Sequence, residues 1–128
     1  MNANQFVNSL LGSILLNSNV DLSAQRDALV ALYDGTDNGL SAILRQMADS
    51  QSFIDAEYNP SFVVMEYFGY LRRNPDQGGY DFWLGQVNKF PLRDVGVQHA
   101  MACSFITSEE YQTRFSSVVT HTDSECPQ

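Results

Sequence analysis

The chain has 128 residues, a length that suits one compact domain rather than two. Seven Lys and Arg residues against fifteen Asp and Glu residues give a net charge of −8 at pH 7, the opposite of the basic surface that binds nucleic acid or an anionic membrane. With 44% hydrophobic and 17% charged residues, the composition also excludes an intrinsically disordered chain. We therefore expect an acidic, soluble, globular domain that binds no nucleic acid.

The first apolar segment, residues 6–16, is the only candidate for a targeting or membrane segment. It is interrupted by polar residues, and no Lys or Arg precedes it. A signal peptide needs a positively charged start, and a membrane-spanning helix needs about 20 apolar residues. Phe6, Leu10 and Ile14 recur at helical spacing, so the segment predicts an amphipathic first helix and no membrane insertion.

Helical periodicity continues along the chain, and the alternating pattern of strands is absent. Two sets of apolar residues each form one stripe on a helix, namely Leu40, Ile43, Leu44 and Met47, and Tyr80, Trp83, Leu84 and Val87. Residues 34–39 and 74–79 are rich in Asp, Asn and Gly, which is typical of turns between helices. The fold class we expect is all-α, a compact bundle of several helices.

Two helix starts are predicted from capping patterns. Asn59 followed by Pro60 predicts a cap and a first helical position, so that the apolar segment 62–71 forms a central helix. Thr107 and Glu110 have the spacing of a capping box for the last helix.

The sequence also contains signs of one internal repeat. Four pairs of similar residues occur in the same order at offsets drifting from 56 to 53, namely Phe6-Val7 with Phe62-Val63, Asp21 with Asp76, Met47-Ala48 with Met101-Ala102, and Glu57-Tyr58 with Glu110-Tyr111. The alternative is chance matching among common residues. We expect one domain, 1–128, built from half-repeats of about 6–58 and 62–115, whose apolar faces bury each other, with a tail at 116–128.

No arrangement of residues predicts catalysis. His99 and His121 are the only histidines, and neither has a nucleophile beside it in a recognisable motif. Aspartates in the two turns could offer oxygen ligands to calcium, but Gly85 occupies the position where an EF-hand loop needs a bidentate Glu. We expect no enzyme, no metal and no cofactor.

The two cysteines allow two interpretations. Cys103 lies in an apolar stretch and Cys126 in the polar tail. A disulfide between them would fix the tail to the domain, and free, unrelated thiols are the alternative because spacing does not determine pairing.

The candidate binding residues surround the second turn. Aromatic rings next to Asp, Asn and Arg are typical of carbohydrate sites, where rings stack on sugars and polar groups bind hydroxyls. The alternative is that the aromatic rings pack in the core, since Tyr80 and Trp83 belong to a helical stripe. The candidate site consists of Tyr70, Arg73, Asn74, Asp76, Tyr80 and Trp83.

The second half of the chain resembles the bacterial family called domain of unknown function 4214. The resemblance rests on three motifs, which are Phe62-Val63 with Tyr67, Arg73-x-Pro75-Asp76-x-x-Gly79-x-x-x-Trp83, and Ser108-x-Glu110-Tyr111. Phe6-Val7 and Val20-Asp21 look like a degenerate first copy without the Pro and the Trp, so that the resemblance covers residues 6 to 115. The tail is similar to that of acidobacterial members.

This resemblance implies a helical, non-catalytic module of exported or cell-surface proteins, similar in pattern to phycobilisome linker domains. It implies that the Arg73 to Trp83 motif builds a corner between two helices. An extracellular location also favours the Cys103–Cys126 disulfide. We therefore expect an extracellular or cell-surface attachment module that binds a glycan or a surface protein beside its neighbouring domains in a longer exported protein. The alternative is a structural scaffold or linker that mediates protein association.

Overall fold

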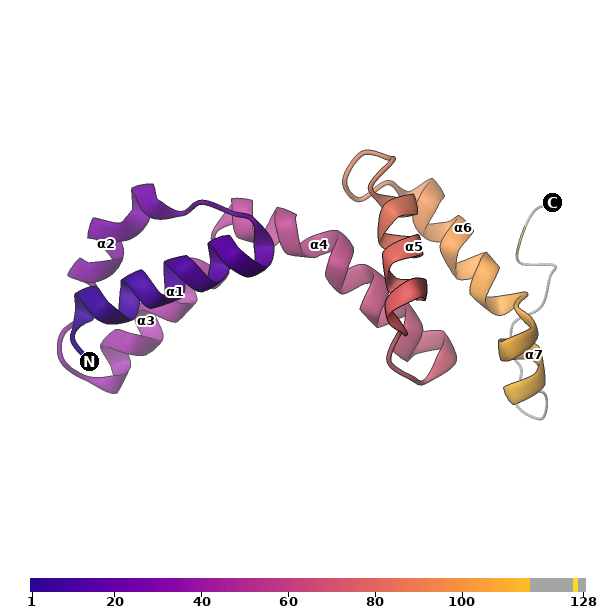
Figure 1. Cartoon of the computed structure of the whole chain (residues 1–128), viewed down its shortest axis with the longest axis horizontal. Helices are drawn as coiled ribbons and strands as arrows, with labels where there is room; N and C mark the ends of the chain where they lie inside the picture. Colours follow the sequence, from indigo (N-terminus) through magenta and orange to yellow (C-terminus); the bar gives the residue numbers. More distant parts are fainter. Residues whose placement is uncertain (116–125, 127–128) are drawn as a thin grey trace. The chain divides into compact units, whose positions relative to one another are not determined.

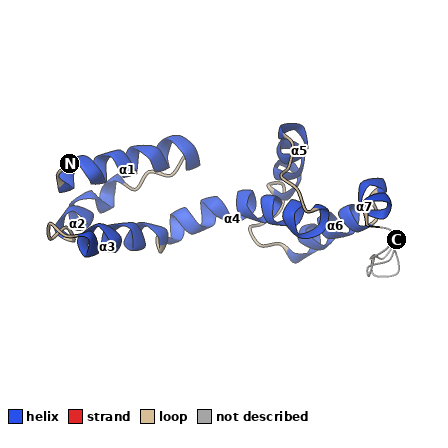
Figure 2. Ribbon diagram, turned by 90° about the horizontal axis from the view of Figure 1, so that it is seen from below, coloured by secondary structure: helices blue, strands red, loops and turns tan. Residues whose placement is uncertain are grey.

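The computed structural model describes residues 1–115 and 126, and the regular secondary structure of these residues is all helical, without strands (Figures 1 and 2). The α-helices are α1 (Ala3–Ser18), α2 (Arg26–Ala31), α3 (Asp37–Ala48), α4 (Gln51–Glu66), α5 (Gln77–Val87), α6 (Val95–Ile106) and α7 (Glu109–Arg114). A 3-10 helix, η1 (Ser23–Gln25), precedes α2, and a π-helix, η2 (Tyr67–Leu71), follows α4. The predicted all-α class is confirmed. No described helix is long and apolar enough to cross a membrane.

The chain divides into two compact units, an N-terminal unit, Met1–Glu57, and a C-terminal unit that starts at Tyr58. Each buried cluster belongs to one unit. The junction falls beside the predicted boundary between half-repeats. The prediction of one domain and that of an internal duplication both remain predictions.

The N-terminal unit packs α1, α2 and α3 around a small apolar core. Its buried members are Val7, Leu22, Leu29, Ile43 and Met47. A capping box between Asn2 and Gln5 starts α1, and Thr36 caps α3 by accepting from the Gly39 N–H. The predicted α3 stripe is narrower than expected, because Leu44 is 48% exposed.

The C-terminal unit has the larger core, to which α4, η2, α5, α6 and α7 all contribute. Its buried members are Val63, Tyr67, Leu71, Val87, Met101, Phe105, Ile106 and Tyr111. Val63, Tyr67 and Leu71 recur every four residues, so one face of the chain from α4 into η2 enters the core.

The prediction that a helix starts at Pro60 is wrong, since α4 starts at Gln51 and Pro60 lies inside it. A proline within a helix removes a backbone donor, yet core contacts hold α4 on both sides, through Phe53 in one unit and Phe62 in the other. The α-helix then ends at Glu66 and continues as η2. The segment 62–71 is also not buried all round, because Met65 is 69% exposed.

The predicted capping box of the last helix is wrong as well. Ser108, not Thr107, caps α7, and its Oγ accepts from the Tyr111 N–H at 3.1 Å. The Thr107 hydroxyl donates to the Cys103 carbonyl oxygen. Glu110 does not reach back to the cap, because its carboxylate binds Arg73.

Candidate functional site

The corner between η2 and α5 contains most of the predicted site. Arg72 ends η2 in the left-handed conformation, with φ 55°, and the chain then turns through Pro75 into α5. Asp76 caps α5 by accepting from the Gly79 N–H at 3.3 Å. A Cβ atom on Gly79 would collide with the Tyr67 hydroxyl, so glycine is needed there for the close approach of α5 to η2.

Arg73 joins this corner to α7. Its Nε donates to Glu110 Oε1 at 2.6 Å and its Nη2 to Oε2 at 2.9 Å, the bidentate geometry that gives strong, oriented pairs. Its Nη1 donates to the Asn74 carbonyl oxygen at 3.0 Å and lies 3.6 Å from Asp76 Oδ1. Its guanidinium carbon also lies 5.1 Å from the centre of the Tyr67 ring. The Arg73 guanidinium is therefore engaged by groups of the protein itself.

The titration behaviour of the corner agrees with a structural role. The hydrogen bonds from Arg73 lower the pKa of Glu110, and the same bonds raise the pKa of Arg73. Burial, followed by the nearby charge of Asp76, raises the pKa of Tyr67. Arg73 and Glu110 thus keep their charges at neutral pH and Tyr67 keeps its proton, so none of them is tuned for proton transfer there.

The aromatic members of the predicted site pack against the core of the C-terminal unit. Tyr70, Tyr80 and Trp83 are partly buried against that cluster. The Trp83 ring meets Phe105 edge to face, with the ring centres 5.5 Å apart, and the Tyr70 ring meets it at 6.5 Å. Core packing, the alternative interpretation, thus accounts for much of this aromatic group.

Among the predicted residues, Trp83 lines a groove that the described part of the chain forms. This α5–α6 groove has a volume of about 540 Å³ and lies within the C-terminal unit. It is lined by Phe82, Trp83, Gln86, Phe90, Asp94, Gly96, Val97, Ala100, Met101 and Ser104. Asp94 is the one charged residue among them, and its carboxylate accepts from the Val97 N–H at 2.9 Å as the cap of α6.

Two phenylalanines form walls of the groove, and small residues of α6 form another side. Phe82 and Phe90 are 56% and 48% exposed, and Gly96, Ala100 and Ser104 follow one another at intervals of four along α6. Phe90 and the whole α6 side of the groove lie outside the site predicted from the sequence. The available signal was spacing, since Phe82, Gln86 and Phe90 recur every four residues, although Phe90 lies beyond the end of α5.

A second, more polar hollow of about 440 Å³ lies in the N-terminal unit. Its lining includes Leu32 from the end of α2 and, from α3, Asn38, Ala42, Arg45 and Asp49. Among the described residues, no three His, Cys, Asp or Glu side chains are grouped to hold a metal ion.

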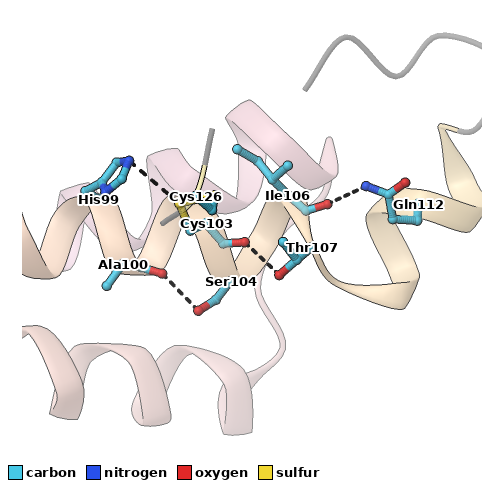
Figure 3. The surroundings of a disulfide bond; sticks show 8 residues. All are labelled: His99, Ala100, Cys103, Ser104, Ile106, Thr107, Gln112 and Cys126. Atoms are coloured by element: carbon cyan, nitrogen blue, oxygen red, sulfur yellow. Dashed lines mark hydrogen bonds between the residues drawn. A yellow bond between two sulfur atoms is a disulfide. The ribbon is translucent and has the colours of Figure 1, made fainter. Parts of the chain in front are cut away.

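The two cysteines form a disulfide (Figure 3), which confirms the first of the two interpretations of the sequence and not the alternative of free thiols. Their Cα atoms are 5.6 Å apart. Cys103 lies on α6, and Cys126 is the one described residue of the tail. His99 lies one helical turn before Cys103, with its Nε2 3.7 Å from the Cys103 Sγ.

Comparisons with known proteins point to one family. A search of curated proteins found no match, and neither did a search of solved structures. The family described as "Domain of unknown function (DUF4214)" matches residues 44–115, which is more than half of the chain and includes the Arg73 corner, the groove and α7. The predicted degenerate copy before residue 44 lies outside the match and stays a prediction. The chain belongs to the DUF4214 family.

Proposed function

We propose that this protein is a non-catalytic attachment module that binds a partner protein through the α5–α6 groove. The observation that carries the proposal is the apolar lining of the groove next to exposed Phe82 and Phe90. Soluble domains seldom keep large aromatic residues exposed together without a binding role. We further propose an extracellular or cell-surface location, which the Cys103–Cys126 disulfide supports because oxidising compartments preserve such bonds.

The chemistry of the groove favours an amphipathic α-helix as its occupant. The lining offers one carboxylate, that of Asp94, which already caps α6, and it contains no Lys, Arg or His, so an anionic ligand would find no counter-ion among the lining residues. Small residues at intervals of four on α6 allow a helix to approach closely, and the walls supplied by Phe82 and Phe90 would pack beside it. A neighbouring domain of a longer exported protein would be the natural source of such a helix.

The first test uses a displayed library of amphipathic helical peptides against the full chain. Trp83 is the only tryptophan and lines the groove, so a bound peptide should change its fluorescence. Ala100→Phe fills the groove without adding a second tryptophan, and we expect it to reduce peptide binding at least tenfold.

Ala42→Phe is the matched control, because Ala42 lines the hollow of the N-terminal unit instead. It should leave peptide binding unchanged. A library that yields no binder, or binders that Ala100→Phe does not weaken, would contradict the proposal.

A carbohydrate ligand is the second candidate. It is favoured by the exposed face of Phe82 next to Trp83, with Gln86 and Ser104 as hydrogen-bonding groups in the same groove. The test is a glycan array together with the fluorescence of Trp83 on addition of mannose and other simple sugars. Saturable binding that Ala100→Phe removes would support this ligand, and a negative array with unchanged fluorescence would exclude it.

A further inference from the structure

The disulfide has a histidine, His99, beside it, although a purely structural disulfide needs no such neighbour. His99 and Cys103 are four residues apart on α6 and share a face, with 3.7 Å between the imidazole Nε2 and the sulfur (Figure 3). His99 is exposed, and Cys103 is partly buried. The hydroxyls nearby do not compete for the sulfur, since Ser104 donates to the Ala100 carbonyl oxygen and Thr107 to that of Cys103.

We propose that the Cys103–Cys126 disulfide is an exchangeable clasp, and that His99 is the positioning residue that makes Cys103 its reactive sulfur. A protonated imidazole beside a sulfur stabilises the thiolate, which is both the nucleophile and the leaving group in thiol–disulfide exchange. Cys103 lies where such an imidazole is available. Apart from the disulfide itself, no contact of Cys126 with a titratable side chain is found among the described residues.

The exchange requires an external dithiol as reductant. Its thiolate attacks one sulfur of the clasp, the bond between Cys103 and Cys126 breaks, and the displaced sulfur leaves as a thiolate. The second thiol of the reductant then displaces the remaining protein sulfur. The dithiol becomes a cyclic disulfide, and the protein gains two electrons and two protons. Closure is the reverse, in which the Cys103 thiolate attacks a mixed disulfide on Cys126 and expels the small thiolate.

Most charged groups on the elements packed against α6 are bound to partners other than Cys103. On α7, Glu110 is bound to Arg73, and Arg114 donates to the Leu71 carbonyl oxygen. On α5, Asp81 accepts from Gln77. Glu109 is exposed in the first turn of α7. His99 is therefore the titratable group that contacts the Cys103 sulfur in the described part of the chain.

Opening the clasp would act on the Arg73 corner. The covalent loop from Cys103 to Cys126 contains α7, and α7 supplies Glu110 to Arg73 and the buried Tyr111 to the core. Reduction thus removes a restraint on the helix that holds the corner together. The clasp is a redox-sensitive fastening of α7, separate from the groove and its partner.

The test measures how Cys103 reacts once it is the only thiol. In Cys126→Ser, we expect iodoacetamide to alkylate Cys103 with an apparent pKa below about 8.5, the ordinary value for cysteine. Adding His99→Gln should move the pH profile of Cys103 alkylation back toward the ordinary cysteine value and slow alkylation at pH 7. The alkylation rate at pH 7 should change about threefold for each unit of pKa, because a stabilised thiolate is more abundant but less nucleophilic.

Ser104→Ala, in the Cys126→Ser background, is the matched control on the same helix and should leave the profile unchanged. A second measurement keeps the disulfide intact, in case Cys126→Ser unfolds. The full chain and its His99→Gln variant are equilibrated with reduced and oxidised dithiothreitol, and the variant should be several-fold harder to reduce. Equal reduction equilibria in the two proteins, or equal alkylation profiles with and without His99, would overturn the proposal.

Discussion

The third helices of the two units, α3 and α6, are built alike. Each has twelve residues and a side-chain cap, Thr36 in one and Asp94 in the other. Counted from these starts, two of the three buried residues in each helix occupy the same positions, since Ile43 matches Met101 and Met47 matches Phe105. The repeat read from the sequence instead paired Met47 with Met101, one helical turn away. The shared buried positions therefore appear when the two helices are aligned by their first residues, and not when they are aligned by identical residues.

The second helices differ, and this difference separates the units. Asp76 caps α5, which has eleven residues, whereas α2 has six and no side-chain cap. Phe82 and Gln86 from the longer α5, together with Phe90 from the segment after it, line the apolar groove beside α6. In the N-terminal unit, only Leu32 from the end of α2 lines the corresponding hollow. The capped, longer second helix is thus the feature that goes with the apolar groove in the C-terminal unit.

The largest expected effect tests whether the two cores are independent. Met101→Ala removes a fully buried side chain from the C-terminal core and should destabilise it by about 2–5 kcal/mol. Ile43→Ala should do the same for the N-terminal core. Because each cluster belongs to one unit, hydrogen exchange should rise mainly in the unit that carries the substitution. Equal loss of protection in both units would show that they unfold together, and Met101→Leu, which conserves volume, is the control.

The next effect tests the corner that only the C-terminal unit has. In Gly79→Ala, the new Cβ would collide with the Tyr67 hydroxyl, so we expect a destabilisation of about 1–3 kcal/mol in denaturant unfolding. Tyr67→Phe in the same chain removes that hydroxyl and should restore part of the loss. Gly78→Ala is the matched control, because its Cβ would lie 3.7 Å from the Asp76 side chain, an ordinary contact. A Gly79→Ala protein as stable as Gly78→Ala would refute the close approach.

The smallest effect concerns two glutamates of the C-terminal unit with opposite pH dependence. Burial raises the pKa of Glu66, and no described residue hydrogen-bonds its buried Oε2. The folded state therefore holds that proton more tightly than the unfolded state, and stability contributed by Glu66 is gained as pH falls through its raised pKa. Arg73 lowers the pKa of Glu110, so stability from Glu110 is complete above the unfolded value of about 4.3 and is lost as pH falls through the lowered pKa.

Glu66→Gln should accordingly stabilise the protein at pH 7, and Glu110→Gln should destabilise it, each by an amount on the order of 1 kcal/mol. The difference for Glu66→Gln should shrink as the pH falls to about 4 and that for Glu110→Gln only as the pH falls further, and chemical unfolding at several pH values measures both. If the two variants change stability in the same direction at pH 7, the assigned environments are wrong.

Local patterns were enough for much of this fold. The all-α class follows from helical periodicity, and the cap at Asp76 follows from an aspartate after the proline of a turn. Pro60 failed as a boundary because core contacts on both sides keep it inside α4. The candidate binding residues stay a prediction, and two of them, Arg73 and Asp76, have hydrogen-bond partners within the fold. Arg73 and Asp76 appeared available to a ligand because Glu110, the partner of Arg73, is 37 residues away in sequence.

What the sequence by itself determined is the helical class, the turns and the family, because these depend on residues close together along the chain. Only the tertiary structure decided which of those residues remain available to a partner. Arg73 is engaged by Glu110, and Trp83 lies half in the core. Phe90 and Ala100 line a groove only because α5 and α6 pack side by side. Which side chains remain uncovered depends on contacts between distant segments, and these form only when the helices pack.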